Sequence, residues 1–293
     1  MKVSIGTKYG DWATCTTGKG RFINRLIPEL KELGAEIVEP GEKADIDLQL
    51  GKYVWEPNAT KSIIRMGCPH FDDKDANKRK VAAIKYADAV IYQSEFARKW
   101  CDKLLTPAKK WAVINNGATP NPSTQQGYQK TFIASTRIWT KQKRLKEIVR
   151  AYKKAKTGIL WIVGKVEKKH YATGVYYVGN LKDDKLIRYL KNADVMIHMC
   201  ERDACPNSVV EAMLCGCRVI TNEDAGTREL LTEKDIVIKH MRDLPKAMKT
   251  ITPERLYPEK LDIKNVAKRY YSFFQEVLYG SDGVCAAVCA ETC

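Results

Sequence analysis

The sequence predicts an α/β protein built on parallel β-sheets, because strand-like and helix-like segments alternate along most of the chain. The clearest example begins with an apolar run at 195–199, which is typical of a buried strand. Val209, Val210 and Met213 then recur at helical spacing, and a second short strand is expected at 218–221. Such alternation produces parallel strands with helices between them.

The length and composition indicate a globular chain with room for two domains. The 293 residues are 44% hydrophobic and 29% charged, and a domain typically needs about 100–200 residues. No apolar run approaches the roughly 20 residues of a membrane-spanning helix, and the start of the chain turns polar too soon for a signal peptide. Ten cysteines without a secreted-scaffold pattern favour a reducing cytoplasm.

The net charge of +15 is compatible with an acidic small substrate, an anionic membrane surface or nucleic acid. Much of this charge lies in Lys-rich helices and turns, such as Lys153-Lys154 and Lys168-Lys169. An ordinary solvated surface accounts for such a distribution as well as a functional basic face does.

The first part of the chain alternates between strands and helices. Strands are expected at 3–7, 35–38, 45–50, 62–66 and 87–94, and helices at 21–33, at 76–86 and from Glu95 onward. The helix at 21–33 is amphipathic, and Pro28 should kink it. Ser94 is a suitable N-cap residue for the helix that begins at Glu95. Asp45-Ile-Asp47 could be taken for a metal-binding Asp-x-Asp pair, but we interpret it as an exposed strand face.

The later part repeats the pattern. Strands are expected at 131–135, 159–163, 175–178, 195–199, 218–221 and 235–238, and helices up to Tyr152, at 182–192, from Pro206 onward and at 263–279.

Two loops, at 200–206 and 222–227, should lie at the same edge of the second sheet. Each loop leads into an expected helix, which begins at Pro206 in the first case and at Gly226-Thr227 in the second, and Gly216 caps the helix between them. Free N–H groups and the helix dipole at such positions favour an anion. Because ligands of parallel sheets bind beyond the carboxyl ends of the strands, the stretch predicts a socket for a diphosphate with a hydroxyl-rich group.

The run from Asp203 to Glu211 reads Asp-Ala-Cys-Pro-Asn-Ser-Val-Val-Glu, followed by Ala-Met-Leu-Cys-Gly and Ala-Gly-Thr-Arg-Glu. This run resembles the acid-x7-Glu signature of GT-B glycosyltransferases of family 4, in a branch that reads Asp-x-Cys-Pro-Asn-x-Val-x-Glu-Ala. The resemblance implies the GT-B fold, with two Rossmann-like parallel-sheet domains that face a cleft and a C-terminal helix that crosses back to the first domain.

The resemblance also implies a catalytic set of Asp203, Arg137 and Lys143. Asp203 would bind the sugar hydroxyls near the oxocarbenium-like centre, with Glu201 able to substitute in part, and the two cations would hold the donor diphosphate. The segment between the cations is one residue longer than is usual in the family, which leaves Lys141 as an alternative to Lys143. Without the resemblance, a Lys and Arg cluster before a helix is typical of solvated surface.

Further residues are expected to bind the donor. Glu211 would hold the ribose hydroxyls, and the N–H groups of Asn207 and Ser208 would bind the diphosphate, because Pro206 has no N–H to donate. His70, at a strand end, could touch the sugar or be structural. The other residues that the resemblance assigns to the donor are Gly226, Thr227, Glu229, Asn116, Gly18 and Gly20.

Linker-like composition places a domain boundary at 121–130. The resemblance then implies an N-terminal acceptor domain at 1–120, a nucleotide-sugar domain at 131–262 and a crossover helix at 263–280, followed by a Cys-containing tail at 281–293. Thr119 stands where the family's Val-Ile-x-Asn-Gly-Val-Asp motif has its Asp. In the tail, Cys285, Cys289 and Cys293 could stack on a small helix, bind a metal or form disulfides.

The expected enzyme is a retaining hexosyltransferase. Its co-substrate would be a nucleotide sugar, with UDP- or GDP-sugars favoured, and it would need no cofactor and no metal. Its acceptor would be a glycan, a lipid-linked or another hydroxyl. The expected location is the cytoplasm, with peripheral association with an anionic membrane on the cytoplasmic face as a further option.

Two other functional classes stay open. The first is a catalytically degenerate protein that binds nucleotides or sugars. The departures from the family pattern at Asp203 and Thr119 would favour this class. The second is a basic nucleic-acid-binding protein, which the net charge would favour.

Overall fold

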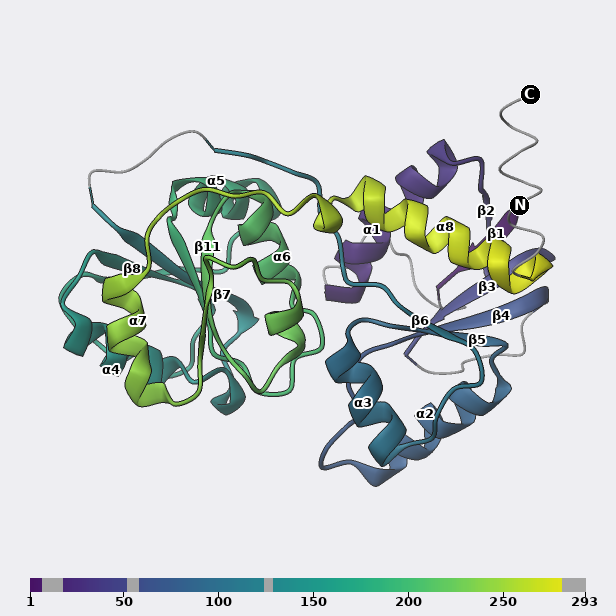
Figure 1. The fold of residues 1–293 in the computed structure, drawn as a ribbon, viewed down its shortest axis with the longest axis horizontal. Coiled ribbons are helices and arrows are strands. Elements are labelled where there is room, and N and C mark those ends of the chain that lie inside the picture. Colours follow the sequence, from purple (N-terminus) through teal and green to yellow (C-terminus); the bar gives the residue numbers. More distant parts are fainter. Residues whose placement is uncertain (7–17, 52–57, 124–128, 281–293) are drawn as a thin grey trace. The chain divides into compact units, whose positions relative to one another are not determined.

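The computed structural model describes residues 1–6, 18–51, 58–123 and 129–280. The chain divides into two α/β units, Met1–Gly117 with Ile263–Cys293 and Ala118–Asp262 (Figure 1). The division falls at Gly117 rather than at the predicted residue 120, and the described residues 118–123 group with the second unit instead of forming a separate linker.

The first unit contains a six-stranded sheet in the order β2-β1-β3-β4-β5-β6, and every neighbouring pair is parallel. The strands are β1 (Lys2–Ile5), β2 (Glu36–Val38), β3 (Ala44–Leu50), β4 (Ala59–Met66), β5 (Ala89–Tyr92) and β6 (Trp111–Val113). The helices are α1 (Gly18–Glu32), α2 (Lys74–Tyr86), α3 (Glu95–Leu104) and α8 (Ile263–Tyr279).

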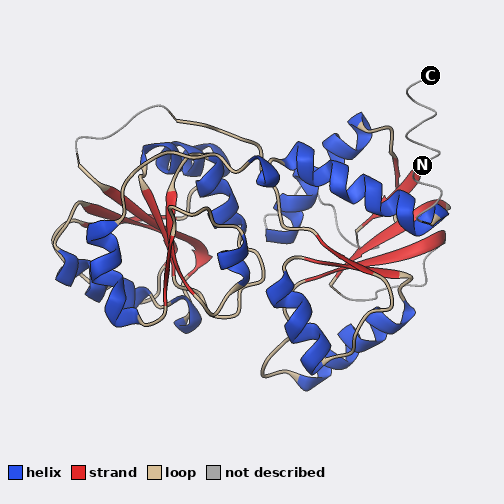
Figure 2. Cartoon of the chain, in the orientation of Figure 1, coloured by secondary structure: helices blue, strands red, loops and turns tan. Residues whose placement is uncertain are grey.

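Helices cover both faces of this sheet (Figure 2). Apolar residues of α1 and α8 pack with β1, β3, β4 and β5 in one core, and residues of α2 and α3 pack with β4 and β5 in another. The helix that the resemblance expected to return from the end of the chain is α8. Its apolar stripe, which runs from Val266 through Tyr270 to Val277, is buried in the core of the first unit.

Two expectations for the first unit are wrong. Helix α1 begins at Gly18 rather than at the expected residue 21, so Gly18 and Gly20 lie in its first turn, because the apolar pattern that predicts a helix does not fix its exact ends. Asp47 is not on an exposed strand face but only 1% exposed. The reason is that β3 is an interior strand of the sheet, and buried strands can carry polar residues only if these find partners.

The second unit contains another parallel six-stranded sheet, in the order β12-β11-β10-β7-β8-β9. The strands are β7 (Thr131–Ile138), β8 (Ile159–Lys165), β9 (Val175–Gly179), β10 (Val195–His198), β11 (Arg218–Asn222) and β12 (Ile236–Ile238). The α-helices are α4 (Leu145–Ala155), α5 (Asp183–Asn192), α6 (Asn207–Leu214) and α7 (Leu244–Thr250). The 3-10 turns are η1 (Lys141–Lys143), η2 (Gly226–Glu229), η3 (Met241–Asp243) and η4 (Glu259–Leu261).

The second sheet is also covered on both faces. Apolar residues of α4 and α7 form one core with the sheet, and those of α5 and α6 form the other. Helix α6 ends as expected, because Gly216 follows it with φ +92°, a conformation that L side chains rarely adopt. The two cores together hold the carboxyl ends of β7, β10 and β11 in fixed register.

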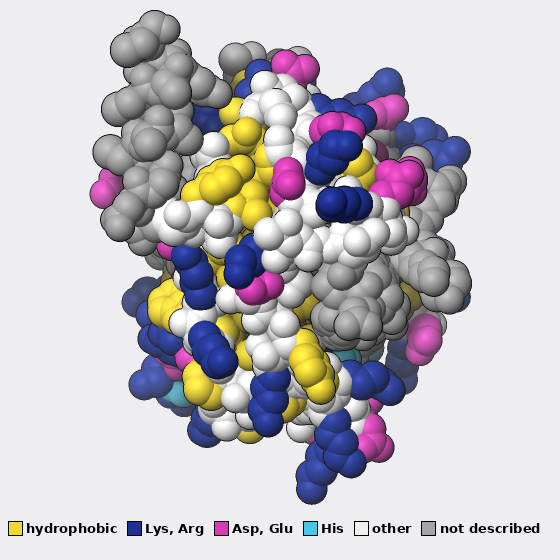
Figure 3. Space-filling model, turned by 90° about the vertical axis from the view of Figure 1, so that its right-hand side faces the viewer, with side chains coloured by type: hydrophobic (Ala, Val, Ile, Leu, Met, Phe, Trp, Pro, Cys, Tyr) yellow, Lys and Arg dark blue, Asp and Glu magenta, His cyan; other side chains and the backbone are white. Residues whose placement is uncertain are grey.

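On the face shown in Figure 3, Lys and Arg side chains are interspersed with acidic and apolar side chains. No helix within the described residues is both long and apolar enough to span a bilayer. The cysteines at positions 68, 101, 200, 205, 215 and 217 are free thiols.

Candidate functional site

Three segments meet at the carboxyl edge of the second sheet, after β7, β10 and β11. The amide of Glu201 donates to the carbonyl of Gln142 at 3.2 Å. The amide of Arg202 donates to the carbonyl of Asp224 at 2.8 Å, and that of Gly226 donates to the carbonyl of Asp203 at 2.8 Å. Backbone hydrogen bonds therefore tie the loop 200–206 to both neighbouring segments, including the loop 222–227, as the sequence analysis expected from their position.

The segment after β7 owes its path to a close approach of two strands. The register between β7 and β8 shifts between Ser135 and Ile138, and Gly164 of β8 has φ +118°. A Cβ on Gly164 would lie 1.9 Å from the Thr136 carbonyl oxygen, so only glycine fits there. A bulge of this kind re-aims side chains near a strand end. Arg137 therefore lies at the irregular end of β7, with an exposed side chain.

Lys143 and Lys141 differ in where the turn η1 places them. The half-buried Lys143 ammonium donates a hydrogen bond to the Thr136 hydroxyl, whereas Lys141 is exposed. Arg144 then adopts a left-handed conformation with φ 55° and forms an ion pair with Glu201. The geometry thus directs Lys143 rather than Lys141 toward the loop after β10. The cationic partner of Glu201 is therefore Arg144 and not Lys143.

His198, which the sequence analysis did not single out, lies at the centre of this edge. It ends β10 and is buried, and its Nε2 is 3.8 Å from Oδ2 of Asp203. Its Nδ1 is 3.1 Å from the hydroxyl of Thr227, and Thr221 donates to its carbonyl oxygen at 2.8 Å. Burial lowers the pKa of His198, the Asp203 carboxylate counteracts this, and the Lys143 ammonium lowers it further.

Cys200 follows at the same edge. Burial raises the pKa of its thiol to about 12, and the Asp203 carboxylate adds to that effect while Lys143 opposes it. The ligand atoms of His198, Cys200 and Asp203 lie within 4.8 Å of one another, and the Lys143 charge acts on both His198 and Cys200.

Helix α6 begins beside this region. Pro206 is the N-cap residue and not the first helical residue, with φ −72° and ψ 120°, and its carbonyl accepts from the amides of Val209 and Val210. Asn207 and Ser208 therefore occupy the first two helical positions, where amides have no acceptor within the helix, and both are half-buried. Glu211 lies one turn further on and is 2% exposed.

The second expected helix start differs from the prediction. Gly226 and Thr227 open the single 3-10 turn η2, which ends at Glu229, instead of an α-helix. One turn aligns few peptide dipoles, so its electrostatic pull on an anion is much smaller than that of α6. Thr227 is fully buried and holds His198, while Glu229 is half-buried.

Four predicted donor residues belong to the first unit: Gly18, Gly20, His70 and Asn116. Asn116 is buried, and its side-chain oxygen accepts a hydrogen bond from Arg65. The exposed His70 is held through its backbone, because its amide donates to the Asn77 side chain at 2.9 Å. Burial and the Lys80 charge lower the pKa of His70. The cleft that the resemblance implies between the domains stays a prediction.

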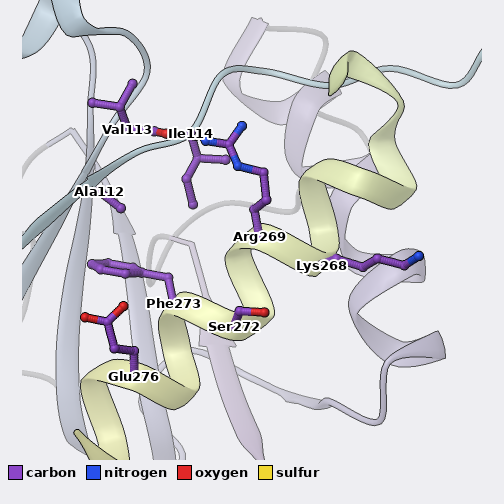
Figure 4. Close-up of a pocket in the computed structure, with 8 residues that line it drawn as sticks. All are labelled: Ala112, Val113, Ile114, Lys268, Arg269, Ser272, Phe273 and Glu276. Carbon is purple, nitrogen blue, oxygen red and sulfur yellow. Dashed lines mark hydrogen bonds between the residues drawn. The ribbon is translucent and has the colours of Figure 1, made fainter. Parts of the chain in front are cut away.

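A groove of about 390 Å³ also lies in the first unit, between β6 and α8 (Figure 4). Its lining residues are Ala112, Val113, Ile114, Lys268, Arg269, Ser272, Phe273 and Glu276. Arg269 donates to the carbonyl of Val113 at 2.6 Å, and Glu276 pairs with Lys110 at 3.1 Å. These contacts join the edge strand to the helix, and none of the predicted site residues lines the groove.

The chain resembles known proteins at two levels. Residues 129–252 match the family model described as Glycosyl transferases group 1, whereas no curated protein sequence matches the chain. In fold, the chain is similar to sucrose-phosphate synthase from Thermosynechococcus elongatus, with a TM-score of 0.71, 12% identity, and coverage of 99% of this chain and 100% of that chain.

Two further solved structures share this fold. AviGT4, a glycosyltransferase involved in avilamycin A biosynthesis, gives a TM-score of 0.72 and 13% identity over 96% of this chain and 99% of that chain. HepE from Anabaena, in complex with UDP and glucose, gives a TM-score of 0.63 and 13% identity over 99% of this chain and 100% of that chain. The chain therefore has the GT-B fold, and the match to the group 1 glycosyltransferase model lies within its second unit. The predicted class of enzyme is confirmed, while membership of family 4 stays a prediction.

Proposed function

We propose that this protein transfers a hexosyl group from a nucleotide-diphosphate sugar to an acceptor hydroxyl. One observation carries the proposal: Lys143, Asp203 and the start of α6 are brought to one edge of the second sheet by loops that are hydrogen-bonded to each other. Such an edge suits a diphosphate, because a fixed cation and the N-terminus of a helix both attract it.

The chemistry needs help mainly at the leaving group. When the bond between the anomeric carbon and the diphosphate breaks, negative charge develops on the diphosphate oxygen and positive charge on the sugar ring. Lys143, Arg137 and the amides of Asn207 and Ser208 would stabilise the oxygen without reorganising, which is the main source of electrostatic catalysis. We assign no metal to this step.

The acids would act on the other parts of the donor. Asp203 lies at the same edge as Lys143 and would bind the sugar hydroxyls beside the positively charged ring. Glu211, one turn into α6, would bind the ribose. Attack of the acceptor hydroxyl on the face that the diphosphate leaves would retain the anomeric configuration, with a departing phosphate oxygen taking the proton.

The donor proposed is a UDP- or GDP-sugar and the acceptor a glycan, a lipid-linked or another hydroxyl. HepE, whose solved complex contains UDP and glucose, supports the uridine alternative by similarity of fold. We place the reaction in the cytoplasm, which keeps thiols such as the six described ones reduced.

A transfer and hydrolysis assay with a panel of nucleotide sugars tests the proposal. Release of nucleoside diphosphate from one donor, undiminished by a metal chelator, is the expected result, and NMR of the product should show the donor's anomeric configuration. Binding of nucleotides without turnover of any donor would instead identify a binding protein. Salt-sensitive binding of DNA or RNA without nucleotide-sugar binding would favour the nucleic-acid alternative.

A further inference from the structure

We propose that His198, Cys200 and Asp203 form a binding site for one zinc ion. Their ligand atoms (a ring nitrogen, the sulfur and a carboxylate oxygen) all lie within 4.8 Å of one another. Nitrogen, sulfur and oxygen donors of this kind are those that Zn²⁺ binds in proteins. The site does not rest on the proposed transferase function.

The distances fit a tetrahedral ion after a small adjustment. Ligands at about 2.0–2.3 Å from zinc lie roughly 3.3–3.8 Å from each other. Nε2 of His198 and Oδ2 of Asp203 are already 3.8 Å apart, too far for a hydrogen bond but suitable for sharing an ion. The limit within which all three ligand atoms lie, 4.8 Å, exceeds this range by about 1 Å, so binding requires a side-chain adjustment of about that size.

The hydrogen bond of the His198 ring favours an orientation in which Nε2 faces the proposed zinc site. Zinc-bound histidines usually donate their second ring N–H to an oxygen, which fixes the tautomer. Nδ1 of His198 lies 3.1 Å from the hydroxyl oxygen of Thr227, and Thr227 is fully buried. With Nδ1–H donating to Thr227, Nε2 keeps its lone pair and points toward Asp203.

The backbone holds the three ligands in place. His198 ends a strand that is paired on both sides. Asp203 is fixed because its carbonyl accepts from the amide of Gly226, and the residue before it is bonded to Asp224. The Cys200 thiol donates a weak S–H hydrogen bond to the carbonyl of Glu201 at 3.5 Å. On binding, the thiol gives its proton to solvent and its sulfur to the ion.

The charge near the cluster is nearly balanced. The Arg144 guanidinium is paired with Glu201, and Lys143 and Asp203 carry opposite charges. Three protein ligands leave a fourth position for water, as in open zinc sites. An ion here would occupy the Asp203 carboxylate, so zinc ligation and contact of Asp203 with a donor sugar are alternative states of that side chain.

Titration with Co²⁺, followed by displacement with Zn²⁺, tests the site. The experiment uses the full chain with Cys285, Cys289 and Cys293 changed to Ser, so that thiols of the tail contribute nothing. We expect one equivalent of Co²⁺ to produce a thiolate-to-cobalt absorption band in the near ultraviolet, and Zn²⁺ to abolish it.

Two variants and a control make the result specific. Cys200→Ser should lose the band, and Asp203→Asn should weaken Co²⁺ binding at least about tenfold. Cys205→Ser, which changes a buried thiol in the same loop but outside the cluster, should keep the band. Melting curves without metal establish that each variant is folded. Absence of the band in the reference protein, or an equal band in Cys200→Ser, would overturn the proposal.

Discussion

The two sheets of this protein have the same number of strands and the same parallel arrangement, and each buries an arginine in an interior strand, Arg65 in β4 and Arg218 in β11, but the charges of the candidate site lie beyond the strand ends of the second sheet. In the first sheet, Asp47 and Arg65 lie within interior strands and are almost completely buried. In the second, Lys143 and Asp203 lie in segments beyond the strand ends and are only half-buried. Charges inside a sheet serve the fold, whereas charges at the carboxyl edge stay available to a ligand.

The charges of the first sheet have partners within their own unit. Asp47 accepts hydrogen bonds from Ser4 and Gln49, each at 2.8 Å. Arg65 donates to the Tyr270 hydroxyl at 3.0 Å and to Asn116, and its guanidinium lies 4.3 Å from the centre of the Phe22 ring. These contacts join β4 to α1, α8 and the segment after β6. The comparison therefore assigns Asn116, a predicted donor ligand, to the support of Arg65.

Replacing Lys143 should have the largest effect. We expect Lys143→Ala to lower turnover about 10²–10³-fold, because it removes one fixed charge from the developing diphosphate, while the melting temperature changes little. Lys146→Ala, an exposed change on α4, is the matched control and should keep full activity. Steady-state assays of both variants and of Lys141→Ala decide which lysine acts, and a greater loss in Lys141→Ala would reverse the assignment made from the geometry.

A change at Asn116 tests the structural side of the comparison. Asn116→Ala leaves the buried Arg65 guanidinium without one acceptor, so we expect the free energy of unfolding to fall by about 1.5–3 kcal/mol. Asn115→Ala is a matched control, because it removes a hydrogen bond from a neutral amide to the carbonyl of Gln93 and should cost only about 0.5–1.5 kcal/mol. Urea denaturation measures both. Equal losses would show that Asn116 does not support a buried charge.

A change at Asp47 should have the smallest effect, which is on the free energy of unfolding and depends on pH. Burial raises the pKa of this carboxyl above its ordinary 3.8, and hydrogen bonds from Gln49 and Ser4 offset part of the rise. The folded state therefore holds the proton more tightly than the unfolded chain does, and stability falls as pH rises from 3.8 through the folded-state pKa.

The variant Asp47→Asn carries no such proton. We expect its stability at pH 4 to be within about 1 kcal/mol of the wild type and to improve relative to the wild type as pH rises to 7. Urea denaturation at several pH values between 4 and 7 provides the measurement. A difference between the two proteins that stays constant with pH would show that Asp47 titrates normally.

Local patterns in the sequence predicted most elements of the fold. Ser94 caps α3 as expected, with its hydroxyl accepting from the Ala97 amide at 3.1 Å, and the helix expected at 263–279 is α8. These features depend on residues close together in the chain, such as a cap or an apolar stripe. Helix α7 was missed because its seven residues are too few to show clear periodicity.

The details of the candidate site depend on contacts between distant segments. In the sequence, His198 is part of an apolar run. Its position at the carboxyl edge of the sheet follows only from the pairing of β10 with β11 and from the contact with Thr227. The path of Arg137 depends on Gly164, which follows it by more than twenty residues and whose φ is +118°. Asp47 was predicted to be exposed because alternating polarity is typical of a half-buried strand. The sequence does not show that β3 lies between β1 and β4, which is why Asp47 is buried.

The central claim is that the carboxyl edge of the second sheet binds a diphosphate through Lys143. Isothermal titration of the wild type and Lys143→Ala with UDP, GDP and the corresponding monophosphates tests it most directly. The account predicts that one nucleoside diphosphate binds the wild type more tightly than its monophosphate, and that this preference shrinks in Lys143→Ala. Equal affinity for diphosphate and monophosphate, or a preference unchanged in the variant, would contradict it.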